Sequence, residues 1–194
     1  MKVLVILGHP NPGESFNRAI AETAGRVLRE LGHEPVLRDL YAEGFDPVMP
    51  MGEEKLPIEE LPESIRREID AVRGAGGFVI VHPNWWGTPP AILKGWLDRV
   101  FRAGFAYSFS ENGVISNFTD KRAQIFTTSN TPRDVELEVY HDPLENFWKT
   151  IVFGLVGSKD FGRRNFESII MSSPEERAAW LAEVESIIRE RFAE

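Results

Sequence analysis

Residues 8–17 form a segment of small, polar and aromatic residues between an apolar run and a helical pattern. The segment holds two glycines and two prolines and ends in Ser15, Phe16 and Asn17. Where a loop leads into a helix, free backbone N–H groups and the positive end of the helix dipole favour a phosphate group. The segment lacks the glycine-rich dinucleotide pattern and the Gly-Lys-Ser/Thr pattern of nucleotide-binding loops. We therefore consider it a candidate anion-binding loop. The alternative, in which Ser15 only caps the helix and the prolines and glycines shape a turn, stays open.

Two adjacent tryptophans, Trp85 and Trp86, lie in a second loop, residues 82–90, which prolines and a glycine stiffen. Neighbouring side chains cannot both be buried on one side of a regular element. A flat aromatic ligand would explain them, because an indole can pack against the face of a planar heterocycle while loop backbone groups reach its edge. In the alternative interpretation, the two tryptophans fill a satellite core or a subunit interface.

A third loop, residues 127–132, is dense in small hydrogen-bonding residues. It begins with Thr127, Thr128, Ser129 and Asn130. By itself this composition indicates only a polar loop. Where the three loops meet, they supply an anion site, an aromatic platform and a polar clamp, which together suit a mononucleotide with a planar ring.

The surrounding sequence predicts strands and helices that alternate. Runs rich in apolar and β-branched residues predict strands at 3–7, 35–40, 78–82 and 122–128, and a fifth strand within 158–171. Apolar positions spaced three and four residues apart predict helices at 15–31, 62–75, 90–102, 143–153 and 173–192. Ser173, Pro174 and Glu176 give the last helix a capping-box start. We expect a long irregular connection at 41–61, a hairpin or excursion at 104–119, and a solvated face formed by the glutamates of 53–60.

This alternation predicts an α/β fold. The expected architecture is a flavodoxin-like three-layer sandwich, in which a five-stranded parallel sheet of order 2-1-3-4-5 carries helices on both faces. Residues 1–194 are expected to form a single domain. Ligands of such sheets bind beyond the carboxyl ends of the strands, next to the point where the strand order reverses. The three loops described above follow strands at that place.

The composition excludes several kinds of chemistry. The chain has 194 residues and no cysteine, which excludes disulfides, thiolate nucleophiles and cysteine-bound metal centres. Its four histidines lack metal-ligand spacing, so no metal site is expected. A net charge of −8 argues against binding to nucleic acid or to an anionic membrane, and no stretch is apolar enough to insert into a bilayer. The start of the sequence lacks the features of a signal peptide, so we expect a cytoplasmic protein.

Several stretches resemble one known family: residues 5–9 with 15–17, residues 39–41 with 45–47, and above all residues 90–107. They are similar to the NAD(P)H:quinone oxidoreductases of flavodoxin-like fold. That family includes bacterial modulator-of-drug-activity proteins and the flavoprotein ancillary subunits of glutathione-gated potassium efflux systems. The resemblance covers most of the chain. It implies a bound flavin, FMN or FAD, and NADH or NADPH as the hydride donor.

The resemblance also implies roles for individual residues. On the phosphate and ribityl side of the flavin it places His9, Ser15, Phe16 and Asn17. Along the flavin ring it places Pro83, Asn84, Trp85, Trp86, Thr127 and Thr128. The family's glycine pair is replaced by Ser129 and Asn130, which puts side chains where bare backbone approaches the flavin.

The proton-handling tyrosine and histidine of the family's quinone reductases are not both present. Tyr140 takes the position of the histidine, and the tyrosine has no counterpart. Tyr140 or His141 is a candidate proton donor to the reduced acceptor. The alternative is that both are interface or cap residues.

The implied reaction is a two-electron reduction of a quinone or similar small acceptor by hydride transfer through the flavin. Members of the family form homodimers, and the aromatic segment 147–153 is expected at such an interface. An alternative function is a flavin-binding regulatory subunit that docks peripherally on a potassium efflux transporter, with incidental reductase activity. A third alternative, a one-electron carrier similar to flavodoxin, is disfavoured by the stretch 90–107.

Overall fold

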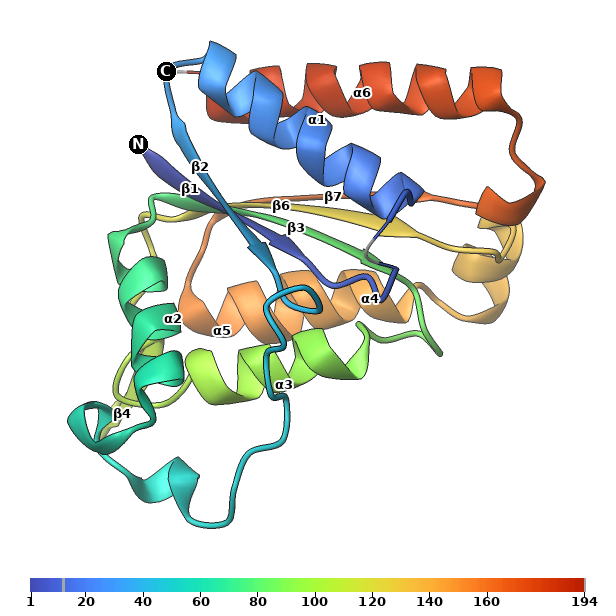
Figure 1. Ribbon diagram of the computed structural model, residues 1–194. Coiled ribbons are helices and arrows are strands. Elements are labelled where there is room, and N and C mark those ends of the chain that lie inside the picture. The colour runs from blue at the N-terminus through green and yellow to red at the C-terminus, as the bar shows by residue number, and fades with distance from the viewer. Residues whose placement is uncertain (12, 194) are drawn as a thin grey trace.

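The computed structural model describes residues 1–11 and 13–193 and contains a five-stranded parallel sheet (Figure 1). The strands are β1 (Lys2–Leu7), β2 (Glu34–Asp39), β3 (Gly77–Pro83), β6 (Arg122–Thr128) and β7 (Asp160–Phe166). They pair in the order β2-β1-β3-β6-β7. Because β4 and β5 form a separate hairpin, this order is the predicted 2-1-3-4-5, and the predicted fold class is confirmed.

Helices cover both faces of the sheet (Figure 1). One face carries α1 (Phe16–Glu30) and α6 (Pro174–Phe192). The other carries α2 (Glu63–Gly74), α3 (Ala91–Val100), α4 (Pro143–Glu145) and α5 (Gly154–Val156). Successive residues of β1 supply the two cores in turn, since Leu4 packs into one buried cluster and Val5 into the other. The result is the predicted three-layer sandwich.

The central strands bring their carboxyl ends to one edge. Every residue of β3 is buried, as its apolar sequence predicts for a strand covered on both faces. In the register, Leu7 pairs with Val81 and Pro83 pairs with Thr128. The loops after β1, β3 and β6 therefore leave the sheet side by side.

The two long helices start where the sequence predicts. Ser15 caps α1, with its side-chain oxygen accepting a hydrogen bond from the backbone N–H of Arg18 at 3.1 Å. Ser173 and Glu176 form both halves of the capping box of α6. These N-cap signals lie within a few residues of the helix starts, which is why the local sequence predicts where α1 and α6 begin.

The predicted helix at 143–153 is only partly regular. After α4, residues Asn146–Phe153 form π-helical turns that continue into α5. A further π-helical turn, Val135–Val139, lies where the sequence predicts a loop. Hydrogen bonds from residue i to i+5 do not follow the period of 3.6, so an analysis of apolar spacing does not find them.

The long connection after β2 contains two 3₁₀ turns, Glu53–Lys55 and Ile58–Glu60. The predicted solvated face is wrong for Glu53, which is buried. Its carboxylate accepts hydrogen bonds from Arg99 Nε at 2.8 Å and from Arg99 Nη2 at 2.6 Å. A buried carboxylate is tolerated when a cation pairs with it, and α3 supplies that cation from outside the local sequence. The other glutamates of this run are exposed as predicted: Glu54, Glu59 and Glu60.

The remaining elements are short. β4 (Tyr107–Ser110) and β5 (Gly113–Ser116) form an antiparallel hairpin within the predicted excursion at 104–119. A 3₁₀ turn, Ile169–Met171, lies between β7 and α6. Across residues 1–11 and 13–193, none of the helices has the length and apolar character needed to cross a membrane.

Candidate functional site

Backbone hydrogen bonds fix the starting point of each of the three loops. Gly8 N donates to Val81 O at 2.9 Å, and Asn84 N donates to Thr128 O at 2.7 Å. Ser129 N donates to the carbonyl oxygen of Phe166 at 2.9 Å. In each bond the donor is the first residue after the end of a strand, and the acceptor belongs to the neighbouring strand. The predicted meeting of the three loops at the carboxyl edge is therefore present.

The first of these loops, residues 8–15, is here called the anion loop. Asn11 organises it, since its side-chain oxygen accepts from Gly13 N at 2.9 Å and its side-chain nitrogen donates to Glu14 O at 3.0 Å. Burial lowers the pKa of His9, which favours the neutral imidazole. Three backbone N–H groups are engaged locally: that of Arg18 by the Ser15 side chain, that of Gly13 by Asn11, and that of Asn11 by His9 Nδ1 at 3.2 Å. A pocket of about 580 Å³ beside it is lined by Gly13, Glu14, Ser15, Phe16, Arg18, Ala19, Glu22 and Arg177.

Asn17 connects the anion loop with the third loop. Its side chain is buried, and Nδ2 donates to Thr128 Oγ1 at 2.9 Å. Its Oδ1 has no hydrogen-bond partner in the described part of the chain. A buried acceptor of this kind needs a donor, and a ligand hydroxyl group at this edge would supply one.

The two tryptophans lie on a tight turn. Trp85 and Thr88 exchange two backbone hydrogen bonds of 3.1 Å, and Asn84 Oδ1 accepts from Gly87 N at 2.9 Å. Trp86 and Gly87 both have positive φ, 57° and 72°, as the central residues of a type I′ turn require. The Trp86 side chain is fully exposed (101%), whereas Trp85 is 42% exposed. Trp86 therefore does not fill a core within the subunit, which leaves the ligand platform and the subunit interface as interpretations.

Backbone strain is concentrated near this edge of the sheet. Four described non-glycine residues have positive φ: Trp86, His141, Asp142 and Ser168. They follow β3, the π-helical turn 135–139 and β7. A left-handed conformation is costly for a bulky residue such as tryptophan, and conformations of this kind cluster at functional sites.

The polar side chains of the third loop are engaged within the protein. Thr127 Oγ1 donates to Asn165 Oδ1 at 2.7 Å, and Thr128 Oγ1 accepts from Asn17 as described above. Ser129 Oγ donates to the carboxylate of Glu136 at 3.0 Å and accepts from Thr131 N at 2.9 Å. The extra side chain of Ser129 is thus held by protein groups.

A pocket of about 550 Å³, here called the ring pocket, opens between the second and third loops. Its lining consists of Asn84, Trp86, Gly87, Ser129, Asn130, Thr131, Glu136, Tyr140 and Pro143. Five predicted site residues are among them: Asn84, Trp86, Ser129, Asn130 and Tyr140. Ser15 and Phe16 line the pocket beside the anion loop instead. The remaining predicted residues line neither pocket: His9, Asn17, Pro83, Trp85, Thr127, Thr128 and His141.

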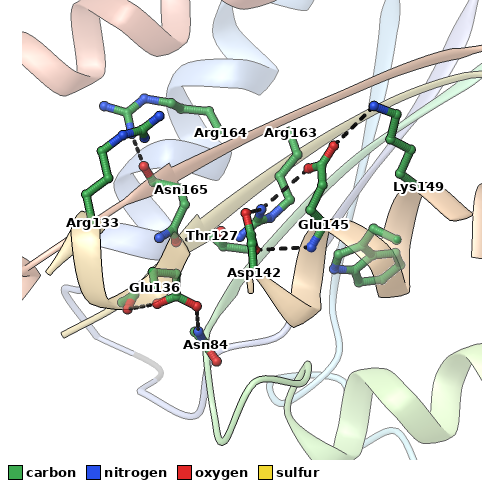
Figure 2. Close-up of polar contacts among 12 residues, drawn as sticks. Asn84, Thr127, Arg133, Glu136, Asp142, Glu145, Lys149, Arg163, Arg164 and Asn165 are labelled. Atoms are coloured by element: carbon green, nitrogen blue, oxygen red, sulfur yellow. Dashed lines mark hydrogen bonds and ion pairs between the residues drawn. The ribbon is translucent and has the colours of Figure 1, made fainter. Parts of the chain in front are cut away.

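The sequence analysis did not identify Glu136, which lies at the wall of the ring pocket (Figure 2). Glu136 is 1% exposed. Asn84 Nδ2 donates to Oε1 at 2.8 Å, and Ser129 Oγ donates to Oε2 at 3.0 Å. One carboxylate therefore joins the second loop to the third. The alternating apolar and acidic residues of 135–139 gave no signal for it, because a π-helical turn decides which of them points inward.

The two predicted proton donors differ in position. Tyr140 lines the ring pocket and is 56% exposed. His141 is exposed, has a φ of 57°, and is not part of the lining. The structure therefore brings Tyr140, and not His141, to the pocket.

The predicted interface segment 147–153 needs correction. Trp148 and Phe153 are fully buried in the core of the subunit. Trp148 Nε1 donates to His82 Nε2 at 2.9 Å, and burial lowers the pKa of His82 to about 4. The π-helical turns direct these aromatic side chains inward, while Ile151 is 54% exposed. Within the predicted segment, Trp148 and Phe153 are therefore not available to a partner, whereas Ile151 is.

Comparisons with known proteins agree with this geometry. Residues 1–191 match the model of a family described as flavodoxin-like fold. An uncharacterized NAD(P)H oxidoreductase from Haemophilus influenzae is 38% identical over 131 residues, which cover 66% of this chain and 64% of that protein. The chain thus spans less than two thirds of the length of this curated relative.

Two solved structures are similar over nearly the whole chain. A crystal structure from Streptococcus mutans has a TM-score of 0.87 and 34% identity, and covers 98% of this chain and 100% of that one. The NAD(P)H:quinone oxidoreductase from Methanothermobacter marburgensis has a TM-score of 0.83 and 25% identity, over 97% and 98% of the two chains. These findings confirm the family resemblance. The chain belongs to the flavodoxin-like family that includes the NAD(P)H:quinone oxidoreductases.

Proposed function

We propose that this chain is a flavin-dependent oxidoreductase that uses NADH or NADPH to reduce quinones or similar small acceptors. The observation that carries the proposal is the ring pocket. Its lining combines the exposed indole of Trp86, on a turn with positive φ, with the polar side chains of Ser129 and Asn130 from the third loop. It lies on the edge of the sheet that also holds the anion loop. Relatives and solved structures named as NAD(P)H oxidoreductases support the same activity.

The residues at this edge fit a flavin. The buried, unpartnered Oδ1 of Asn17 can accept a hydrogen bond from a ligand hydroxyl group, and the fully exposed indole of Trp86 offers a face to a planar ring. We propose that the phosphate and ribityl chain bind at His9, Ser15, Phe16 and Asn17. The ring would lie along the other two loops, at Pro83, Asn84, Trp85, Trp86, Thr127, Thr128, Ser129 and Asn130. The same residues serve FMN and FAD, whose ring, ribityl chain and first phosphate are identical.

When bound, the flavin supplies the chemistry of two-electron hydride transfer. The residues of this chain orient it and handle protons. Asn84, Ser129 and Glu136 hold the walls of the ring pocket in place through their mutual hydrogen bonds. The phenol of Tyr140 stands at the rim, where it can donate a proton to an acceptor.

We further propose that the chain forms a homodimer through the apolar surface next to the ring pocket. Exposed apolar side chains lie at its rim and on the π-helical turn before it: Tyr140, Leu137 and Val139. Ile151, from the predicted segment 147–153, is exposed as well. A cluster of this kind is typical of a protein interface. No specific observation favours the alternative of a regulatory transporter subunit, whereas the named relatives favour the enzyme.

Steady-state kinetics test the proposed activity. Flavin-loaded protein should oxidise NADH or NADPH in the presence of a simple benzoquinone, and heat denaturation should release a flavin that chromatography identifies as FMN or FAD. Glu190→Gln, a substitution at an exposed position of α6, is the control and should oxidise nicotinamide as fast as the unchanged protein. The proposal is wrong if neither nicotinamide is oxidised at a rate above that of free flavin.

A further inference from the structure

Glu136 borders two hollows in the protein. One is the ring pocket. The other, here called the polar cavity, has a volume of about 250 Å³ and is lined by Arg133, Glu136, Leu137, Asp142, Glu145, Arg163, Arg164, Asn165 and Glu167. Among the described residues, Glu136 is the one that belongs to both linings. A single acidic residue thus borders both the ring pocket and the polar cavity.

The polar cavity contains buried donors with free capacity. The side chain of Arg163 is 3% exposed, and its Nη1 donates to Asp142 Oδ2 at 2.7 Å. Its Nε and Nη2, and Nδ2 of Asn165, have no hydrogen-bond partner among residues 1–11 and 13–193. All three atoms are donors, and buried donors in a polar cavity of this size are satisfied by water.

The polar cavity also has a route to bulk solvent. Arg133, whose side chain is 69% exposed, lines it and forms an ion pair of 3.1 Å with Glu167. The polar cavity thus borders bulk solvent at Arg133 and borders Glu136 as well. The polar cavity is lined by cationic and anionic side chains in similar numbers. The cations are Arg133, Arg163 and Arg164, and the anions are Glu136, Asp142, Glu145 and Glu167.

The carboxylate of Glu136 has hydrogen-bonding capacity that the described residues do not use. Each carboxylate oxygen accepts one hydrogen bond from the ring-pocket side, from Asn84 and from Ser129. Each oxygen keeps a second lone pair. No arginine, lysine or histidine nitrogen lies within 4.0 Å of this carboxylate in the described part of the chain, and the cavity arginines Arg133 and Arg163 pair with other carboxylates.

The proposed reaction needs a proton as well as a hydride. Reduction of one quinone consumes one NAD(P)H and one proton, and yields NAD(P)⁺ and hydroquinone. The hydride brings two electrons and one hydrogen nucleus, and the second hydrogen of the hydroquinone comes from solvent. An acceptor bound beside the flavin ring would restrict the access of solvent through the opening of the ring pocket, so a route from behind the pocket has a clear use.

We propose that Glu136 relays this proton from water in the polar cavity to the acceptor in the ring pocket. The O–H bond of a hydrated proton in the cavity breaks as that proton bonds to a carboxylate oxygen of Glu136, and neutral water is left behind. The new bond then breaks as the proton passes to the oxygen of the acceptor, and the carboxylate is restored. The inference rests on the proposed quinone reduction and adds the residue and the path that deliver the proton.

The test separates the two half-reactions by stopped-flow absorbance with flavin-loaded protein. Glu136→Gln keeps the size and the acceptor for Asn84 but cannot carry a proton. We expect the nicotinamide half-reaction to stay within about twofold. The acceptor half-reaction should slow by about 100-fold, in the range for removal of a general acid, with a larger solvent deuterium effect. Glu136→Asp should restore part of the rate, and Glu138→Gln, an exposed carboxylate two residues away, should leave both half-reactions unchanged.

Two measurements that do not depend on turnover check the site itself. The flavin dissociation constant and the thermal midpoint of Glu136→Gln should stay close to those of the unchanged protein. A loss of flavin binding would mean that Glu136 only holds the loops, which overturns the relay.

Other outcomes distinguish the relay from the proposed function. If the unchanged protein completes both half-reactions and Glu136→Gln does so equally fast, the relay is wrong and the reductase stands. If Tyr140→Phe, and not Glu136→Gln, slows the acceptor half-reaction, the proton comes from the rim. If the unchanged protein is not reduced by either nicotinamide, both proposals fail together.

Discussion

Replacement of Trp86 by asparagine should change stability and flavin binding in opposite directions. In the protein alone, the indole is fully exposed and its φ is 57°, so it contributes no burial and carries backbone strain. Trp86→Asn creates an Asn-Gly pair with Gly87, the preferred sequence for a type I′ turn. Relief of a left-handed conformation in a bulky residue stabilises the flavin-free protein by about 1 kcal/mol. For a chain of this length, that raises the melting temperature by about 2–4 °C.

The same substitution should weaken flavin binding. Stacking of an aromatic side chain on a heterocyclic base contributes about 1–3 kcal/mol. Its loss raises the dissociation constant of the flavin roughly 5- to 150-fold. Calorimetric melting of the flavin-free protein and titration of flavin fluorescence measure the two effects independently.

Met51→Asn is the matched control, because Met51 is also fully exposed and lies outside the lining of the ring pocket. It should leave the dissociation constant unchanged. The reasoning is refuted if Trp86→Asn binds flavin as tightly as the unchanged protein, since Trp86 would then not contact the ring. A fall in melting temperature would refute the assignment of strain.

Three further predictions concern the scaffold of the site. Glu53→Gln removes the buried counter-charge of the Arg99 guanidinium and leaves only the exposed carboxylate of Asp46, at 3.8 Å. It should lower the free energy of unfolding by about 3 kcal/mol in urea, whereas Glu54→Gln should not; equal effects would contradict the buried ion pair. Burial lowers the pKa of His82 from 6.5 to about 4, so the folded protein binds fewer protons there than the unfolded chain. The free energy of unfolding contributed by neutral His82 is complete above about pH 6.5. It should fall by about 3 kcal/mol as the pH drops to 4. If His82→Gln had the same pH dependence of stability as the unchanged protein, this would be refuted. Gly95→Ala places a Cβ 2.2 Å from the carbonyl oxygen of Pro47 and should cost about 2 kcal/mol in urea unfolding; a neutral result would mean that the connection moves aside freely.

The sheet and its functional edge followed from local sequence patterns. The apolar run of β3 and the caps at Ser15 and Ser173 each carry their own signal, because burial on both faces and helix capping constrain short segments. The order of the strands then followed from the rules for crossover connections. These rules placed Asn84 and Ser129 on adjacent loops before any side-chain contact was known.

The features that the sequence did not predict depend on contacts between distant segments. Glu53 is buried because Arg99, 46 residues away, reaches it from α3. Glu136 is buried because Asn84, 52 residues away, donates to it. Trp148 turned out to be a core residue because π-helical turns rotate the segment toward His82. In each case the local sequence is compatible with exposure, and only the assembled fold decides.

One anaerobic titration tests the central claim, that the carboxyl edge of this sheet holds a flavin that accepts a hydride. Flavin-loaded protein is mixed with one equivalent of NADPH or NADH and then with one equivalent of benzoquinone, while the visible absorbance is recorded. We predict that the flavin band bleaches with at least one nicotinamide and returns in full with the quinone. A band that persists after both nicotinamides, in protein that retains its flavin, would contradict the account.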